Sequence, residues 1–90
     1  MTFFYTHVLV SSKDKRFYTG SSEDLKGRFE ARKKGQVKST QDRRPLKLVY
    51  YEACRDKKDA MHRELYLKSH HGKMFLRNRL KSYLTGPKES

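Results

Sequence analysis

The stretch from residue 17 to residue 28 constrains the fold of this chain more than any other. Residues 17–20, Phe-Tyr-Thr-Gly, have the composition of a short strand ending in glycine, and the next four, Ser-Ser-Glu-Asp, are typical of the start of a helix. The pattern predicts a strand-to-helix corner that carries the Tyr18 phenol and the Arg28 guanidinium. The first amide groups of a helix are unpaired and favour anions, so this corner is a candidate phosphate site. The alternative is an ordinary corner whose arginine faces solvent.

The composition predicts one basic globular domain. Its 90 residues suffice for a single core, and 22 Lys and Arg residues against 10 Asp and Glu residues give a net charge of +12. This charge makes nucleic acid the expected partner, although an anionic membrane surface would also attract it. The sequence has neither a long apolar run nor a secretory signal, so we expect a soluble, cytoplasmic protein without a membrane partner.

Aromatic and β-branched residues predict three strands. Residues 3–10 form the first, a polar turn follows at 11–15, and residues 16–19 return as the second strand of an antiparallel hairpin. Alternation along the first strand puts Tyr5, His7 and Leu9 on one face. Pro45 opens the third strand, at residues 46–53.

Helical periodicity predicts the remaining elements. A first helix spans residues 22–34 and stops at Gly35, an irregular loop follows at 36–44, and a second helix spans 57–69. Gly72 interrupts the pattern before a last helix that carries apolar residues from Met74 to Leu84. The predicted fold class is α+β, with a small three-stranded antiparallel sheet flanked by helices in the order β-β-α-β-α-α. We expect one domain over residues 1–85 and a disordered tail over 86–90.

The second helix carries a carboxylate among apolar residues. Glu64 is surrounded in sequence by Ala60, Met61, Leu65 and Leu67, which the helical pattern places on one side. An unpaired, ionised carboxylate is costly to bury, so Glu64 must pair with a base, bind a metal or open to a cleft. The plainest alternative to a functional role is an ion pair with a core-edge arginine such as Arg28.

Taken together, these segments resemble the GIY-YIG nuclease superfamily, in its small single-domain branch. The likeness covers nearly the whole chain, and the order and spacing of its parts are more specific than any one of them. The first motif falls at residues 5–9, the second at 18–20, the helix signature at Leu25 and Arg28, the middle segment at 38–40, 44–45 and 48–52, and the metal-binding helix at 63–64 and 66–68.

The resemblance implies a metal-dependent DNA endonuclease that hydrolyses phosphodiester bonds, is selective for DNA structure and is linked to repair or recombination. It implies that Glu64 holds the metal, most naturally Mg²⁺ with Mn²⁺ as the other option, and that Arg28 clamps the phosphate. Tyr18 would orient or help to deprotonate the water, which requires positive charge to lower its pKa. The residues expected to contact DNA phosphates are Arg32, Lys38, Arg43, Arg44 and Lys73.

Two positions depart from the family pattern. His7 stands where the first motif usually ends in tyrosine, and Arg32 stands where a histidine often follows the helix arginine. A histidine can act as a catalytic base or hold a water, but it can equally be a packed strand residue in a site that has lost activity. Two alternatives to an active enzyme therefore stay open: a catalytically impaired nucleic-acid-binding module on the same fold, and a basic RNA- or ribosome-associated protein.

Overall fold

The computed structural model describes residues 2–86 and has the predicted α+β class and element order. Its elements are β1 (Phe4–Ser11), β2 (Phe17–Ser22), α1 (Leu25–Lys33), the short 3-10 helix η1 (Gln41–Arg43), β3 (Leu46–Cys54), α2 (Lys57–Lys68), α3 (His70–Arg79) and α4 (Lys81–Thr85).

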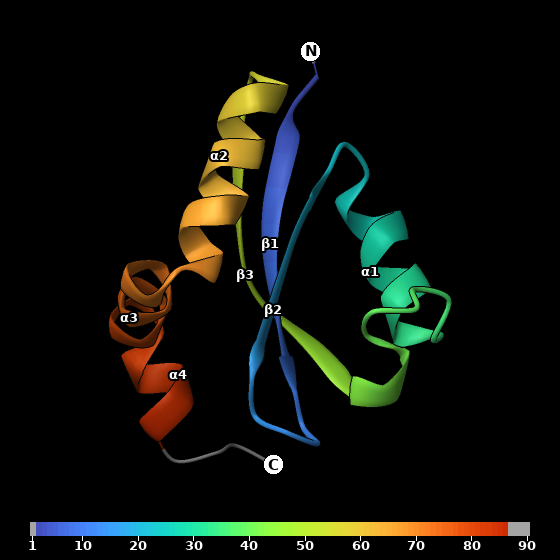
Figure 1. Ribbon diagram of the computed structural model, residues 1–90, viewed down its shortest axis with the longest axis vertical. Helices are drawn as coiled ribbons and strands as arrows, with labels where there is room; N and C mark the ends of the chain where they lie inside the picture. Colours follow the sequence, from blue (N-terminus) through green and yellow to red (C-terminus); the bar gives the residue numbers. More distant parts are fainter. Residues whose placement is uncertain (1, 87–90) are drawn as a thin grey trace.

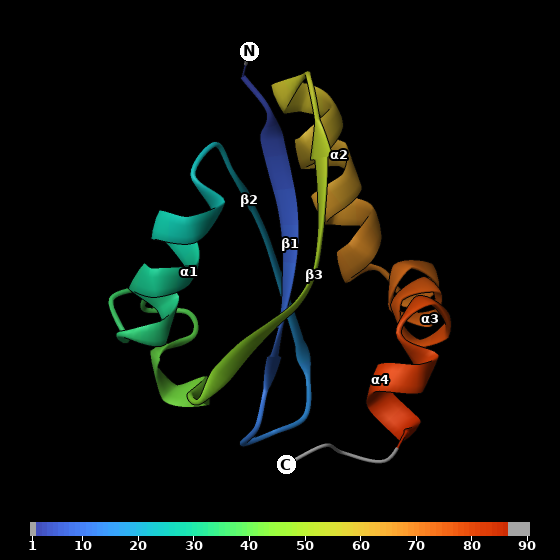
Figure 2. The ribbon, with the colours of Figure 1, turned by 180° about the vertical axis from the view of Figure 1, so that it is seen from behind.

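The three strands form one antiparallel sheet in the order β2-β1-β3, so β1 is central and β2 is an edge strand. In the register, His7 of β1 lies opposite Gly20 of β2 and Tyr51 of β3. Helix α1 covers one face of the sheet, and α2, α3 and α4 lie on the other (Figures 1 and 2). The fold therefore has three layers, with β2 running between α1 and α2.

The apolar core lies between the sheet and the C-terminal helices. Val8 of β1, Leu67 of α2 and Leu76 of α3 are fully buried against one another. The Thr6 hydroxyl donates a 3.0 Å hydrogen bond to the backbone carbonyl of Ala60, which ties β1 to α2. Because side chains alternate along a strand, Thr6 and Val8 face α2, while His7 faces α1.

The strand-to-helix corner differs in detail from its prediction. β2 does not end at Gly20 but continues to Ser22, because Ser21 and Ser22 pair with Thr6 and Tyr5 of β1. The helix begins three residues later, at Leu25, and Asp24 caps it by accepting a 2.9 Å hydrogen bond from the Gly27 amide. The two serines thus belong to the sheet, and the Ser21 hydroxyl points toward α2, where it contacts Glu64.

The predicted interruption at Gly72 is wrong. Ser69 caps α3 by accepting a 3.1 Å hydrogen bond from the Gly72 amide, and the helix continues through that residue. Gly72 is buried, and a Cβ there would collide with the backbone carbonyl of Tyr66 at the end of α2. The glycine allows the two helices to approach closely at their junction, which a helix-breaking rule does not capture.

The apolar side predicted for α2 is narrower than expected. Ala60 and Leu67 are buried, whereas Met61 is 49% exposed and Leu65 is also exposed. At about 100° per residue, positions 60, 64 and 67 fall within roughly 60° of one another, and 61 and 65 lie to one side. Glu64 is therefore part of the stripe that faces the sheet, while Met61 lies beside it.

The predicted disordered tail, 86–90, lies outside the described residues except for Gly86, which follows the last turn of α4. Within residues 2–86, no helix combines the length and the apolar character needed to cross a membrane.

Candidate active site

A cleft of about 610 Å³ opens at the exposed edge of β2, and we call it the β2 cleft. It brings together three of the four predicted catalytic residues and two of the five predicted phosphate contacts. Its lining residues are Phe17, Tyr18, Thr19, Gly20, Ser21, Arg28, Arg32, Ser39, Thr40, Glu64, Lys68 and Lys73.

The edge position of β2 explains how groups from both faces of the sheet share one cleft. Alternation along β2 directs Ser21 toward the α2 side and Tyr18 and Gly20 toward the α1 side. α1 contributes Arg28 from its side, and α2 contributes Glu64 from the other. Within residues 2–86, β2 is an edge strand of the sheet (Figure 1), so the groups from both faces line the same cleft.

Glu64 has two partners in the cleft. Its Oε1 accepts a 2.7 Å hydrogen bond from the Ser21 hydroxyl, and its Oε2 accepts one of 2.7 Å from Lys68 Nζ. Burial alone would raise the pKa of this carboxyl, but the bonds from Lys68 and Ser21 outweigh it and hold the pKa below its usual value. The ion pair considered with Arg28 is not formed, because Lys68, one turn along α2, takes that place.

Two arginines of α1, one turn apart, present guanidinium groups to the cleft. Arg28 is exposed and makes no ion pair within residues 2–86. Arg32 is only 6% exposed, and its Nε has no hydrogen-bond partner among the described residues. Burial first, and then the charge of Arg28, lower the pKa of Arg32 from its high ordinary value. A buried, unpaired guanidinium of this kind is ready to bind an oxyanion.

His7 lies beneath Gly20 rather than on the cleft surface. Its side chain is fully buried, and neither ring nitrogen has a hydrogen-bond partner among the described residues. A Cβ on Gly20 would lie 3.0 Å from His7 Nε2 and 3.1 Å from Arg32 Nη2, so both groups press against this glycine. Burial, then Arg32 and Arg28, lower the pKa of His7 to about 4, against the opposing effect of Glu64. The imidazole is therefore neutral near pH 7.

Tyr18 is oriented by a residue that the sequence pattern did not single out. Its hydroxyl donates a hydrogen bond to the Asp14 carboxylate in the β1–β2 turn. That bond, followed by burial, raises the pKa of Tyr18 and outweighs the lowering effects of Arg43 and Arg16. The sequence led us to expect that Arg28 would lower the pKa of Tyr18. The pKa is raised instead, because the charge next to the phenol is the negative one of Asp14.

The predicted phosphate contacts divide into two groups. Arg32 and Lys73 line the β2 cleft, and exposed Lys38 directly precedes its lining residue Ser39. Arg43 and Arg44 lie outside the lining. Arg43 Nε is 3.7 Å from Asp14 Oδ2, and Arg44 Nε donates a 2.9 Å hydrogen bond to the Gln41 carbonyl.

Sequence reasoning missed Ser21, Lys68 and Asp14 as partners of the site residues. The Glu64–Lys68 spacing of four on a predicted helix is a signal that could have been used. Ser21 and Asp14 had no such signal, because their roles depend on how far β2 extends and on the turn that precedes it.

Glu64 is the one carboxylate in the lining of the cleft, and residues 2–86 contain no cluster of three His, Cys, Asp or Glu side chains able to hold a metal. Mg²⁺ commonly binds proteins through one or two carboxylates and keeps its waters and substrate phosphates as other ligands. The donor set fits that mode of binding, provided that half-exposed Lys68 releases Glu64 Oε2.

Residues 3–81 match the GIY-YIG catalytic domain family, and the chain therefore belongs to that family. This is a family of nucleases, and membership of it implies a nucleic-acid substrate.

Individual relatives agree with this assignment. A UPF0213 protein of Clostridium perfringens is 40% identical over 65 residues, which is 71% of this chain and 69% of the relative. One from Staphylococcus aureus is 38% identical over 63 residues, or 69% of this chain and 77% of the relative. The solution NMR structure of a UPF0213 protein from Bacillus halodurans, at 31% identity, has a TM-score of 0.51 and covers 94% of this chain and 88% of that one.

Proposed function

We propose that the chain is a metal-dependent DNA endonuclease of the cytoplasm, selective for DNA structure and acting in repair or recombination. The observation that carries the proposal is the convergence of Tyr18, Arg28 and Glu64 on one cleft. The cations around them favour a polyanionic backbone, and contacts to phosphates fix position without reading bases. Structure rather than sequence would then select the substrate.

Arg28 and Arg32 would bind the nonbridging oxygens of the phosphate. Arg28 is free of ion pairs within residues 2–86, and Arg32 has an unpartnered Nε beside it in the lining. Guanidinium groups donate parallel hydrogen bonds to phosphate and stay charged at all working pH values. Two of them on one helix face would neutralise the charge that develops as the phosphate is attacked.

Glu64 would hold the metal, with Ser21 fixing the orientation of its carboxylate. A bound Mg²⁺ or Mn²⁺ would polarise the phosphate and favour deprotonation of a water. Lys68 competes for the same oxygen, but its side chain is half-exposed and can turn toward the incoming phosphate.

Tyr18 would orient the attacking water rather than take its proton. Its pKa is raised by the bond to Asp14, so the phenol stays protonated near neutral pH. Because its one hydrogen is donated to Asp14, its oxygen would accept a hydrogen bond from the water. Neutral, fully buried His7 would have a structural role: its ring packs against Gly20, next to Arg32.

The second candidate is a nucleic-acid-binding module that has lost catalysis. Three observations favour it. Lys68 is hydrogen-bonded to the Glu64 carboxylate, Tyr18 is hydrogen-bonded to Asp14, and His7 does not reach the cleft surface. The same cationic lining would still bind phosphates.

Cleavage assays on the full chain distinguish the two candidates. Branched, flapped and duplex DNAs of one sequence would be incubated with Mg²⁺, with Mn²⁺ or with a chelator. The endonuclease proposal expects metal-dependent cutting of branched or flapped DNA over duplex. Salt-sensitive binding to all of these DNAs without cutting in either metal would favour the binding module instead.

A further inference from the structure

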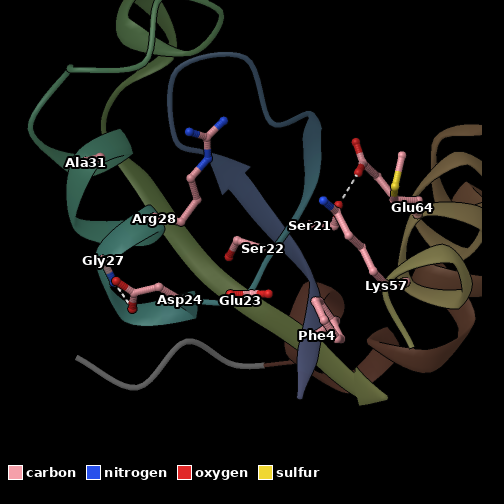
Figure 3. A pocket seen from close by; sticks show the side chains of 12 residues that line it. Phe4, Ser21, Ser22, Glu23, Asp24, Gly27, Arg28, Ala31, Lys57 and Glu64 are labelled. Carbon is pink, nitrogen blue, oxygen red and sulfur yellow. Dashed lines mark hydrogen bonds between the residues drawn. The ribbon is translucent and has the colours of Figure 1, made fainter. Parts of the chain in front are cut away.

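A second cavity, of about 710 Å³, adjoins the β2 cleft and lies between α1 and α2. We call it the α1–α2 pocket. It shares Ser21, Arg28 and Glu64 with the β2 cleft, so a ligand held at those residues borders both spaces. Figure 3 shows Asp24 and Arg28 on the α1 side of this pocket and Lys57 and Glu64 on the α2 side, with Phe4, Ser21 and Ser22 between them.

We infer that the α1–α2 pocket takes one unpaired nucleobase of the nucleic acid whose phosphate binds at Arg28. The inference rests on the proposed function only in assuming that the β2 cleft binds a phosphate. It adds the chemical class of the group that lies next to that phosphate.

The walls of the pocket suit a flat, largely apolar ring. Phe4 of β1, Ala31 of α1, and Ala60 and Met61 of α2 contribute apolar surface, and Met61 is 49% exposed although it lines a concave site. Nucleobases bind proteins by packing their faces on aromatic and aliphatic side chains, and every base offers such a face. An exposed methionine is an adaptable surface for this contact.

The distribution of charge sets the orientation of a bound nucleotide. Exposed Glu23 and Asp24 line this pocket but not the β2 cleft, and Lys57 is the one cation in the pocket lining besides the shared Arg28. The β2 cleft has Arg32, Lys68 and Lys73 in addition to Arg28. Carboxylates repel phosphate and accept hydrogen bonds from the amino groups of bases. The phosphate is therefore directed to the arginines and the base to the side of the carboxylates.

A base stacked inside a duplex cannot enter a pocket of this kind. It has to be unpaired already or to be turned out of the stack, at an energetic cost that is least where pairing is already disrupted. The pocket would thus give the site a preference for strands with unpaired nucleotides next to the bound phosphate. This preference is a physical basis for selecting DNA by structure.

The test compares two ligands that differ only in the base, 2′-deoxyadenosine 5′-monophosphate and 2-deoxyribose 5-phosphate. Both are titrated without metal into the isotope-labelled full chain, and amide shifts are followed by NMR. We expect both to shift the amides of Gly20, Ser21 and Arg28, and the nucleotide alone to shift those of Ala31 and Met61. The nucleotide should bind about tenfold more tightly, a typical gain from packing one base.

Met61→Ala should remove most of the tenfold difference, while Leu65→Ala, an exposed apolar residue outside the pocket, should leave it unchanged. Ala31→Phe, which fills the pocket from α1, is a second variant that should also abolish the tenfold difference.

Equal binding of the two ligands to the wild-type chain would overturn the inference, although the phosphate site would remain. A dimer found by sedimentation, together with slow amide hydrogen exchange at Met61 in the NMR spectra, would also overturn the inference, because a second copy of the chain would then occupy the pocket. Discrimination between the ligands by a chain that never cuts DNA would uphold the pocket and count against the endonuclease alone.

Discussion

Lys68 Nζ lies 2.7 Å from Glu64 Oε2, one helical turn away on α2, and Ser21 holds the other oxygen of the same carboxylate. This pair keeps the Glu64 carboxyl ionised although α2 turns it toward the sheet. It also places a cation where a metal ion would have to bind. The proposed chemistry therefore requires that the pair be weak enough to open.

Replacing Lys68 tests the strength of the pair. In Lys68→Met the pKa of Glu64 should rise, because the hydrogen bond and the charge that lower it are gone. The free energy of unfolding at pH 7 should fall by only about 0.5 kcal/mol, as for other half-exposed pairs of this spacing. Carboxyl ¹³C NMR titration and thermal melting measure the two effects. Lys81→Met on α4 is the control and should leave the Glu64 pKa in place, and an unchanged pKa in Lys68→Met would contradict the assignment.

Burial of His7 should make the fold sensitive to acid. The pKa of His7 is lowered from 6.5 to about 4, so between these values the unfolded chain binds a proton that the folded chain does not. Stability is thus fully present above about pH 6.5 and declines as the pH falls toward 4, by roughly 2–3 kcal/mol from this residue. Urea unfolding across this pH range measures the decline.

The His7→Leu variant isolates the contribution of the imidazole. It keeps an apolar side chain of similar size in the buried position but cannot titrate, so its loss of stability between pH 6.5 and 4 should be smaller than that of the wild type. His62→Leu, an exposed position, is the matched control and should follow the wild type. Parallel curves for wild type and His7→Leu would show that His7 is not buried in its neutral form.

Gly20 should be intolerant of a side chain. A Cβ there would stand 3.0 Å from the His7 ring and 3.1 Å from Arg32 Nη2, closer than ordinary van der Waals contact. We expect Gly20→Ala to lower the free energy of unfolding by about 1–3 kcal/mol, as overpacking does. In a His7→Ala background the same change should cost less, because the ring that it strikes is gone. Equal costs in both backgrounds, measured by denaturant unfolding, would rule out this contact.

The Tyr18–Asp14 hydrogen bond should govern the ionisation of the phenol. Removing the negative charge in Asp14→Asn should lower the pKa of Tyr18 toward its ordinary value of about 10, because Asp14 is the main cause of the rise. Selective ¹³C labelling of tyrosine allows this pKa to be followed by NMR. A Tyr18 pKa that rises or stays constant in Asp14→Asn would contradict the observed contact.

The sheet was predictable from the sequence because its signals are local. Alternation in residues 3–10 and the polar turn at 11–15 define the hairpin, and Pro45 marks the start of the third strand. The end of β2 and the continuity of α3 were not predictable by the same rules. Ser21 and Ser22 are held by pairing with β1, and Gly72 lies in the first turn of α3, capped by Ser69, where the end of α2 leaves no room for a side chain. Tertiary contacts override local preference at both places.

The site was predictable at the level of which residues meet, but not at the level of their partners. The resemblance to the GIY-YIG family assigned Tyr18, Arg28 and Glu64 to one site, and all three line the β2 cleft. The pKa of Tyr18 and the depth of His7 depend on Asp14 in the turn and on the packing of α1 over Gly20, and no pattern in the sequence encodes those distances.

Cleavage and melting measured together on Glu64→Gln test the proposed function most directly. The amide keeps an oxygen for the Ser21 hydroxyl and loses only the exposed pair with Lys68, so the fold should remain within about 1 kcal/mol of the wild type. Binding to DNA should persist, because the arginines of α1 are untouched, while cleavage in Mg²⁺ or Mn²⁺ should fall to background. A folded Glu64→Gln protein that cuts DNA at the wild-type rate would contradict the role of Glu64 as the metal ligand.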